Sequence, residues 1–139
     1  MKYLSRCEAE TEEIGKKVAS LVSDGELVAM YGEMGSGKTV FARGFVHSFL
    51  PDEIVTSPTY ALLNLYSDGK RKVNHFDLFR VESEEDLLSI GFWDVISSGV
   101  TLVEWAENVR EFLPVPRWEL TFRKTGDEKR ELYLEKIER

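Results

Sequence analysis

The segment GEMGSGKT, residues 32–39, follows the apolar run LVAMY and restricts the possible folds more than any other part of the sequence. It has the complete spacing G-x-x-x-x-G-K-T, which is typical of a phosphate-binding P-loop. The glycines allow successive backbone N–H groups to point at phosphate oxygens, and the helix that follows adds the positive end of its dipole. Lys38 would reach the β- and γ-phosphates, and the Thr39 hydroxyl would bind Mg²⁺. The segment therefore predicts a nucleotide site between a buried strand and a helix.

Other polar segments add candidates for nucleotide contacts. In TSPTY, Pro58 forces Ser57 into an extended conformation, so the hydroxyls of Ser57 and Thr59 lie on a stiff loop where nucleotide switches sense the γ-phosphate. A turn that only leads into the next strand is an equally good interpretation. Thr11 and the turn near Lys124 are candidates for the adenine side. The predicted nucleotide-binding residues are Thr11, Glu33, Met34, Gly35, Ser36, Gly37, Lys38, Thr39, Ser57 and Thr59, and the predicted cofactors are ATP and Mg²⁺.

Two acidic residues are candidates for positioning a metal ion or a water molecule. Asp77 lies in the strand-like run HFDLF, and Glu104 ends the apolar run VTLVE. A buried carboxylate without a partner costs several kcal/mol, so such acids favour a functional interpretation. The alternative for Asp77 is a salt bridge with Arg80, and His75 is more typical of a packed strand histidine than of a metal ligand. The predicted catalytic residues are Lys38, Asp77 and Glu104, and the predicted metal ligands are Thr39 and Glu104.

Strands and helices alternate along the chain. Run 27–31 is apolar at every position, as expected for a strand that is covered on both faces, and VTLVE (100–104) is predicted to be a second such strand that ends in an acid. A helix is predicted over 12–22 with Thr11 as its cap, and another from Lys38 to Pro51. Two strand-like runs around SDGK, and two around KTGDEK, predict hairpins. This pattern predicts one α/β domain over residues 1–139, with a P-loop NTPase-like three-layer fold, a mainly parallel central sheet and antiparallel hairpins at its edges.

Composition and charge limit the possible partners and compartment. The formal net charge of −7 argues against direct coating of nucleic acid, which requires many phosphate contacts from Lys and Arg. No apolar run is long enough to cross a membrane, and the N-terminal residues lack the apolar core of a signal peptide. Cys7 is the only cysteine. We therefore expect a cytoplasmic protein that reaches nucleic acid only through a partner.

Trp105, which directly follows Glu104, is interpreted as a core anchor.

Four segments together resemble one family: GEMGSGKT, SPTY, HFDLFR and VEW, in this order. The chain looks like the bacterial ATPase of tRNA threonylcarbamoyladenosine biosynthesis, the TsaE (YjeE) family, and the resemblance runs nearly from end to end. It implies a small cytoplasmic ATPase that works with a two-subunit tRNA threonylcarbamoyl transferase complex. That complex modifies adenosine 37 of tRNAs that read codons starting with A. The chain departs from the family pattern at Phe79, where a tyrosine is usual, and at Ala106, where a proline is usual.

The resemblance leaves the use of ATP to be weighed against two alternatives. The first alternative is a binding module in which ATP orders a docking surface without hydrolysis, and the second is a small-molecule kinase. A chain of this length leaves few residues for an acceptor-binding lid, so water is the expected phosphoryl acceptor. Arg43 and Arg80 are the arginines considered for a catalytic finger. If neither serves, we expect turnover to be slow without a partner.

Overall fold

A mixed β-sheet organises the protein. The computed structural model describes residues 1–33, 35–56, 58 and 62–139. The strands are β1 (Lys2–Ser5), β2 (Leu27–Tyr31), β3 (Leu63–Ser67), β4 (Lys72–Asp77), β5 (Val100–Glu104), β6 (Arg117–Lys124) and β7 (Arg130–Ile137). Within the described residues they form a seven-stranded sheet in the order β1-β7-β6-β2-β5-β4-β3. The central strands β6, β2, β5 and β4 are parallel, and β3, β7 and β1 add antiparallel pairs at the edges. The predicted arrangement of the sheet is confirmed.

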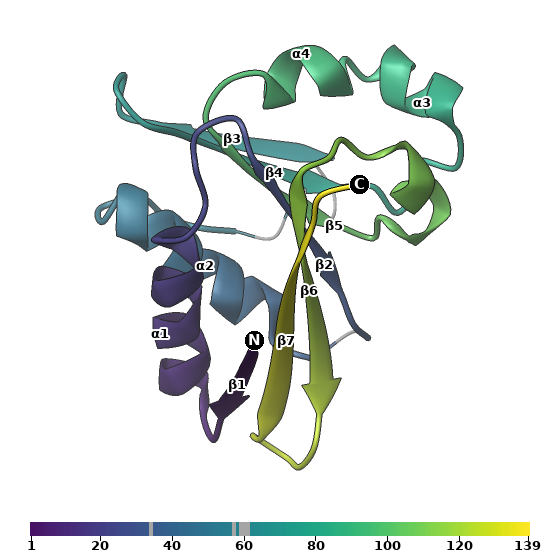
Figure 1. Cartoon of the computed structure of the whole chain (residues 1–139). Coiled ribbons are helices and arrows are strands. Elements are labelled where there is room, and N and C mark those ends of the chain that lie inside the picture. The colour runs from purple at the N-terminus through teal and green to yellow at the C-terminus, as the bar shows by residue number, and fades with distance from the viewer. Residues whose placement is uncertain (34, 57, 59–61) are drawn as a thin grey trace.

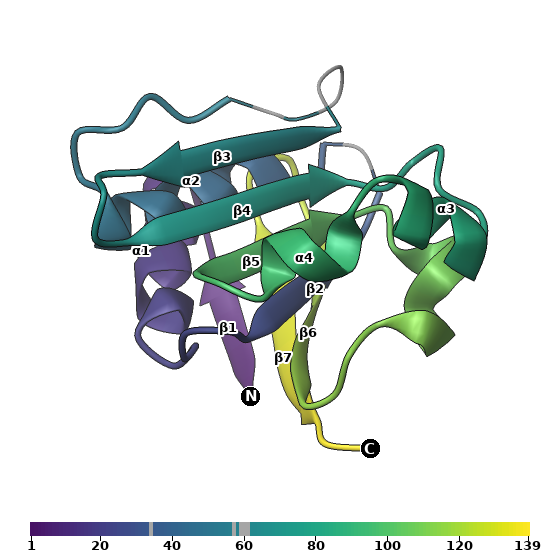
Figure 2. The ribbon, with the colours of Figure 1, turned by 90° about the horizontal axis from the view of Figure 1, so that it is seen from above.

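Helices cover both faces of this sheet (Figures 1 and 2). They are α1 (Glu8–Ala19), α2 (Lys38–Phe49), α3 (Glu84–Ser89), α4 (Phe92–Ile96) and the 3-10 helix η1 (Glu107–Phe112). Helices α1 and α2 lie on one face and enclose one hydrophobic core with the sheet, while α3, α4 and η1 enclose a second core on the other face. Because β2 and β5 lie between the two cores, both strands are buried and mostly apolar, with Glu104 at the end of β5, as the sequence predicts. None of the described helices combines the length and the apolar character needed to cross a membrane.

The first helix differs from the sequence prediction. It begins at Glu8 rather than at residue 12 and ends at Ala19 rather than at residue 22. Its N-cap is Cys7, which is extended, so the helix begins almost directly after β1. Thr11 is inside the helix, where its hydroxyl lies 2.6 Å from Ser5 Oγ. The prediction of Thr11 as the cap was wrong because this hydroxyl has a partner on β1 instead of on the helix backbone.

Helices α1 and α2 touch through their backbones. Gly15 and Gly44 lie at this contact, and a Cβ atom at Gly44 would overlap the carbonyl oxygen of Glu12. A Cβ atom at Gly15 would likewise overlap the carbonyl oxygen of Phe41. Only glycine fits at both positions. The close approach fixes α1 beside the helix that follows the P-loop.

Candidate nucleotide-binding and catalytic site

The P-loop, residues 32–39, connects β2 to α2 and leaves the start of that helix free for an anion. Gly37 is the N-cap of α2 with φ of 102°, and no side chain of the described residues caps the helix there. A residue with a Cβ atom at Gly32 would lie 2.9 Å from the Phe122 side chain and 3.0 Å from Ser36 Oγ. Uncapped N–H groups at a helix start bind phosphate well, because the helix dipole is positive there. These features are the ones that a phosphate-binding loop requires.

A cavity of about 480 Å³ lies at the start of α2. The described residues that line it come from α1, the P-loop, the end of β5 and the turn between β6 and β7. They include Glu8, Thr11, Gly35, Gly37, Lys38, Thr39, Glu104, Trp105, Asp127, Glu128 and Arg130. The structure therefore brings together several residues that the sequence predicts to bind nucleotide. It also brings the β6–β7 turn, near Lys124, to the cavity, and it adds Glu8 and Trp105, which sequence reasoning did not assign to the site.

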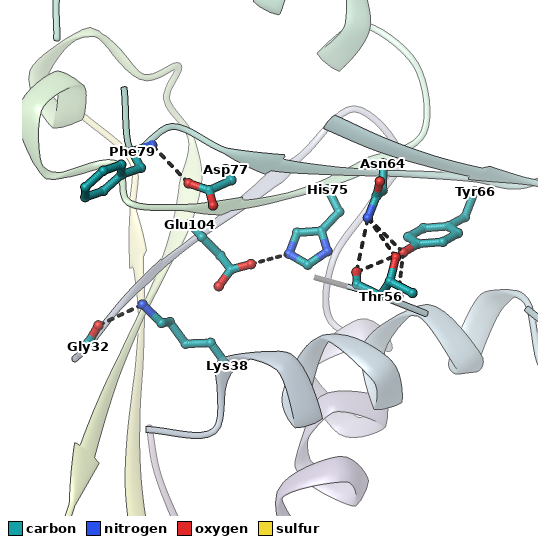
Figure 3. A network of polar contacts seen from close by, with 9 residues as sticks. All are labelled: Gly32, Lys38, Thr56, Asn64, Tyr66, His75, Asp77, Phe79 and Glu104. Atoms are coloured by element: carbon teal, nitrogen blue, oxygen red, sulfur yellow. Dashed lines mark hydrogen bonds and ion pairs between the residues drawn. The ribbon is translucent and has the colours of Figure 1, made fainter. Parts of the chain in front are cut away.

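Lys38 is held by two groups of the protein. Its Nζ donates to the carbonyl oxygen of Gly32 at 2.8 Å (Figure 3). The same ammonium lies 4.5 Å from the ring centroid of Trp105, a cation–π contact. Trp105 has φ of 58° and packs against the exposed ring of Phe79, with centroids 5.3 Å apart. The expectation that Trp105 is a core anchor was wrong, because the ring faces the cavity and the P-loop lysine.

Glu104 is positioned by a buried histidine. The Glu104 Oε2 atom lies 2.7 Å from His75 Nε2, and the two side chains point toward one another (Figure 3). An ionised carboxylate only accepts hydrogen bonds, so this contact assigns the proton to Nε2 of His75. The other ring nitrogen of His75, Nδ1, has no hydrogen-bond partner among the described residues. His75 thus fixes the direction of the Glu104 carboxylate at the end of β5.

Asp77 ends β4 directly beside Glu104 in the strand register. It is 5% exposed, and its Oδ1 accepts a hydrogen bond from the Phe79 backbone at 3.0 Å. Burial raises the pKa of Asp77 above its usual range, the bond from Phe79 partly offsets this, and the negative charge of Glu104 adds to the rise. The alternative of a salt bridge to Arg80 does not occur, since Arg80 lines a second cavity with Asp77 but forms no ion pair in the described part of the chain.

We expect the substitution Asp77→Asn to stabilise the fold at neutral pH. The raised pKa means that folding takes up a proton between the pKa of the unfolded carboxyl and that of the folded one. Stability therefore falls as pH rises through this window, and the full cost is present above it. Asparagine removes the charge and keeps an acceptor for Phe79, so the free energy of unfolding should rise by about 1 kcal/mol.

Urea unfolding of both proteins at pH 7 and at pH 4 measures this effect. The advantage of Asp77→Asn should shrink at pH 4, where the wild-type carboxyl begins to bind its proton in the folded state. The exposed Asp52 provides the control, because Asp52→Asn should change stability by less than about 0.5 kcal/mol at either pH. A lower stability of Asp77→Asn at pH 7 would show that the charge of Asp77 is compensated in the folded protein.

The remaining predicted residues are distributed as follows. Thr11 and Thr39 line the cavity, and the carbonyl of Glu33 accepts a bond from the Ser36 backbone at 3.2 Å. Ser36 is buried, and its hydroxyl has no partner among the residues that the structure describes. The predictions for Met34, Ser57 and Thr59 lie outside the described residues.

Thr56, the first residue of the segment TSPTY, is anchored to β3 by hydrogen bonds. The Thr56 backbone N–H lies 3.1 Å from the Tyr66 hydroxyl, and the Asn64 side chain donates to the Thr56 carbonyl at 3.1 Å (Figure 3).

Neither arginine considered as a catalytic finger lies on the P-loop cavity. Arg43 pairs with Glu12 at 3.4 Å, and Arg80 lines the second cavity. Within the described residues, the site therefore has no candidate finger from these two positions.

The oxygen atoms that Thr39 and Glu104 offer at the P-loop cavity suit a nucleotide-bound magnesium ion. Among the described residues, no group of three or more His, Cys, Asp or Glu side chains could hold a metal ion by itself. Mg²⁺ at phosphate sites is bound by one or two protein oxygens together with substrate phosphates and water. Thr39 and Glu104 line the same cavity and offer a hydroxyl and a carboxylate. These two residues could hold the ion once phosphate is present.

Comparisons with known proteins agree with each other. The family model described as threonylcarbamoyl adenosine biosynthesis protein TsaE matches residues 5–132. A protein of Bacillus subtilis (strain 168), named tRNA threonylcarbamoyladenosine biosynthesis protein TsaE, is 35% identical over 123 residues, covering 88% of this chain and 77% of that protein. The protein of the same name from Treponema pallidum (strain Nichols) is 34% identical, covering 95% and 98%. The crystal structure of Bacillus subtilis YdiB superposes with a TM-score of 0.76 and 30% identity, covering 95% of this chain and 82% of that one.

Proposed function

The chain belongs to the TsaE family of threonylcarbamoyl adenosine biosynthesis proteins, and from this premise we propose that it is a Mg²⁺-dependent ATPase. In this proposal it acts in the cytoplasm on a two-subunit tRNA threonylcarbamoyl transferase complex, and it reaches tRNA only through that complex. The modified position would be adenosine 37 of tRNAs that read ANN codons. The observation that carries the ATPase proposal is the placement of Glu104, fixed by His75, in the same cavity as the P-loop residues Lys38 and Thr39.

The P-loop provides the charge and the hydrogen bonds for the triphosphate. Lys38 moves its ammonium from the Gly32 carbonyl to the β- and γ-phosphates, where it neutralises developing negative charge. The free N–H groups at the start of α2 bind phosphate oxygens. Thr39 and Glu104 would hold Mg²⁺ together with the phosphates, and the ion would supply Lewis-acid stabilisation of the phosphate oxygens.

The two acids take different tasks in this proposal. Glu104 lines the cavity with Thr39, so its carboxylate holds the ion or the attacking water from the side of β5. Asp77 lines the second cavity, and it accepts the N–H of Phe79, whose ring packs on Trp105. Asp77 therefore connects the catalytic edge of the sheet to the exposed Phe79, which packs on Trp105, the ring that contacts Lys38. Its role is to orient water or to couple ATP occupancy to the position of the exposed Phe79 side chain.

The rate of ATP hydrolysis with and without the transferase subunits tests the proposal. ADP and free phosphate are measured together, with the two transferase subunits of the same species as the added partners. We expect equal amounts of both products, slow turnover alone, and an acceleration by the partners of about 10³–10⁵-fold, the range that an added arginine finger supplies. ADP without matching phosphate would instead indicate a kinase, and no ADP with or without partners would contradict an ATPase.

A further inference from the structure

The side chain of Arg130 links the β6–β7 hairpin to the P-loop. Arg130 is the first residue of β7, and its Nε donates to the carbonyl oxygen of Ser36 at 3.1 Å. Its Nη2 donates to the carbonyl oxygen of Gly35, also at 3.1 Å. Two neighbouring carbonyl groups of the P-loop are therefore held by one guanidinium from a strand more than 90 residues away in the sequence.

Holding these carbonyl groups also fixes the N–H groups of the same peptides. In a planar trans peptide the C=O and the next N–H point in opposite directions. The Ser36 carbonyl shares its peptide with the N–H of Gly37, the residue at the start of α2. The Gly35 carbonyl shares its peptide with the N–H of Ser36, which donates to Glu33 within the loop. The contact from Arg130 therefore determines where the Gly37 N–H points.

The guanidinium is itself held in place by the hairpin. Its Nη1 donates to the carbonyl oxygens of Gly126 and Asp127, both at 3.2 Å, and of Lys129 at 2.9 Å. A planar guanidinium with several fixed acceptors loses little further freedom when another group binds near it. The β6–β7 turn thus presents Arg130 to the P-loop in one orientation.

Within the part of the chain that the structure describes, no acid forms an ion pair with Arg130. All of its hydrogen-bond acceptors in the described residues are backbone carbonyl groups. Arg130 also lines the P-loop cavity. Its charge therefore raises the electrostatic potential where phosphate groups would bind.

We propose that Arg130 is a positioning residue of the nucleotide site, which aims the Gly37 N–H at the phosphates and adds positive charge behind the loop. It sets the affinity for nucleoside diphosphates and triphosphates and takes no part in cleavage of the phosphate bond. This inference rests on the proposed nucleotide-binding function. It goes beyond that function by placing a determinant of affinity outside the P-loop, on the last hairpin.

Titration calorimetry with ADP and with Mg·ATP, together with steady-state ATP hydrolysis, tests the inference on the full chain. We expect Arg130→Gln to weaken binding of both nucleotides by about tenfold or more, since it removes charge-assisted hydrogen bonds. The KM for ATP should rise in parallel, while kcat at saturating ATP stays within about threefold. Arg130→Lys keeps the charge without the fork and should fall between wild type and Arg130→Gln.

Arg123→Gln is the matched control, because it removes a positive charge from an exposed position of β6. Its nucleotide affinity should stay within about twofold of wild type, since exposed charges are screened. If thermal unfolding shows that Arg130→Gln does not fold, Arg130→Lys carries the test. Wild-type affinity in the folded variant, or a fall in kcat with unchanged KM, would overturn the inference. Absence of nucleotide binding by the wild-type protein would instead refute the proposed function.

Discussion

Lys38→Ala is expected to lower the affinity for Mg·ATP by about 10²-fold and to reduce hydrolysis below detection. The substitution removes the only P-loop ammonium, and a charge-assisted contact to phosphate is worth about 1.5–3 kcal/mol for each hydrogen bond. The fold should survive, because Nζ makes one hydrogen bond to Gly32 and one cation–π contact with Trp105. Calorimetry measures the affinity, and thermal unfolding checks that the variant is folded.

The control for this substitution is Lys17→Ala. Lys17 is exposed on α1 and, unlike Lys38, is absent from the residues that line the cavity. The control removes the same charge without touching the P-loop, so we expect its affinity for ATP to remain within about twofold of wild type. Equal ATP affinity in Lys38→Ala and wild type would mean that this glycine-rich loop does not bind phosphate through its lysine.

Glu104→Gln is expected to separate binding from turnover. Glutamine preserves the shape of the side chain and retains an oxygen that can accept the bond from His75, but it removes the negative charge. Loss of a carboxylate that positions water or metal should lower kcat by about 10²–10⁴-fold. We expect the affinity for ATP to change much less, because Lys38 and the amides at the start of α2 remain. Single-turnover hydrolysis and calorimetry measure the two quantities on the same preparation.

This variant also distinguishes the ATPase from a binding module that only senses ATP. Glu111→Gln is its control, since Glu111 is exposed on η1 and lies on a different cavity. If Glu104→Gln binds ATP, fails to hydrolyse it and still supports repeated rounds of tRNA modification with the partner subunits, hydrolysis is not required. If modification stops after the first round, turnover is part of the cycle.

The parts of the site that are local in sequence could be predicted from it. The P-loop, its preceding strand and its helix form one continuous segment, so spacing alone locates Lys38 and Thr39. Asp77 and Glu104 could be placed at one edge of the sheet because each follows a strand-like run and parallel strands end at a common edge. The strand register confirms that these two residues are neighbours.

Contacts that depend on strand order had no local signal. Arg130 reaches the P-loop only because β7 pairs with β6, and β6 pairs with β2. No spacing in the sequence reports that order. Thr11 was misassigned as a helix cap for a different reason, since the helix begins at Glu8 and the Thr11 hydroxyl contacts Ser5 on the preceding strand. Trp105 was interpreted from its residue type alone, and neither its left-handed backbone conformation nor its contact with Lys38 is predicted by that type.

The glycine contact between α1 and α2 and the contacts of Arg130 together join the P-loop to the outer strands of the sheet. The P-loop continues into α2, and α2 contacts the backbone of α1 directly at Gly15 and Gly44. From α1 it continues through the Thr11–Ser5 contact into β1, where Ser5 is the register partner of Arg130. Arg130 in turn contacts the P-loop carbonyl groups, so these contacts form a closed ring. The P-loop therefore cannot change its position without a change in at least one contact of this ring.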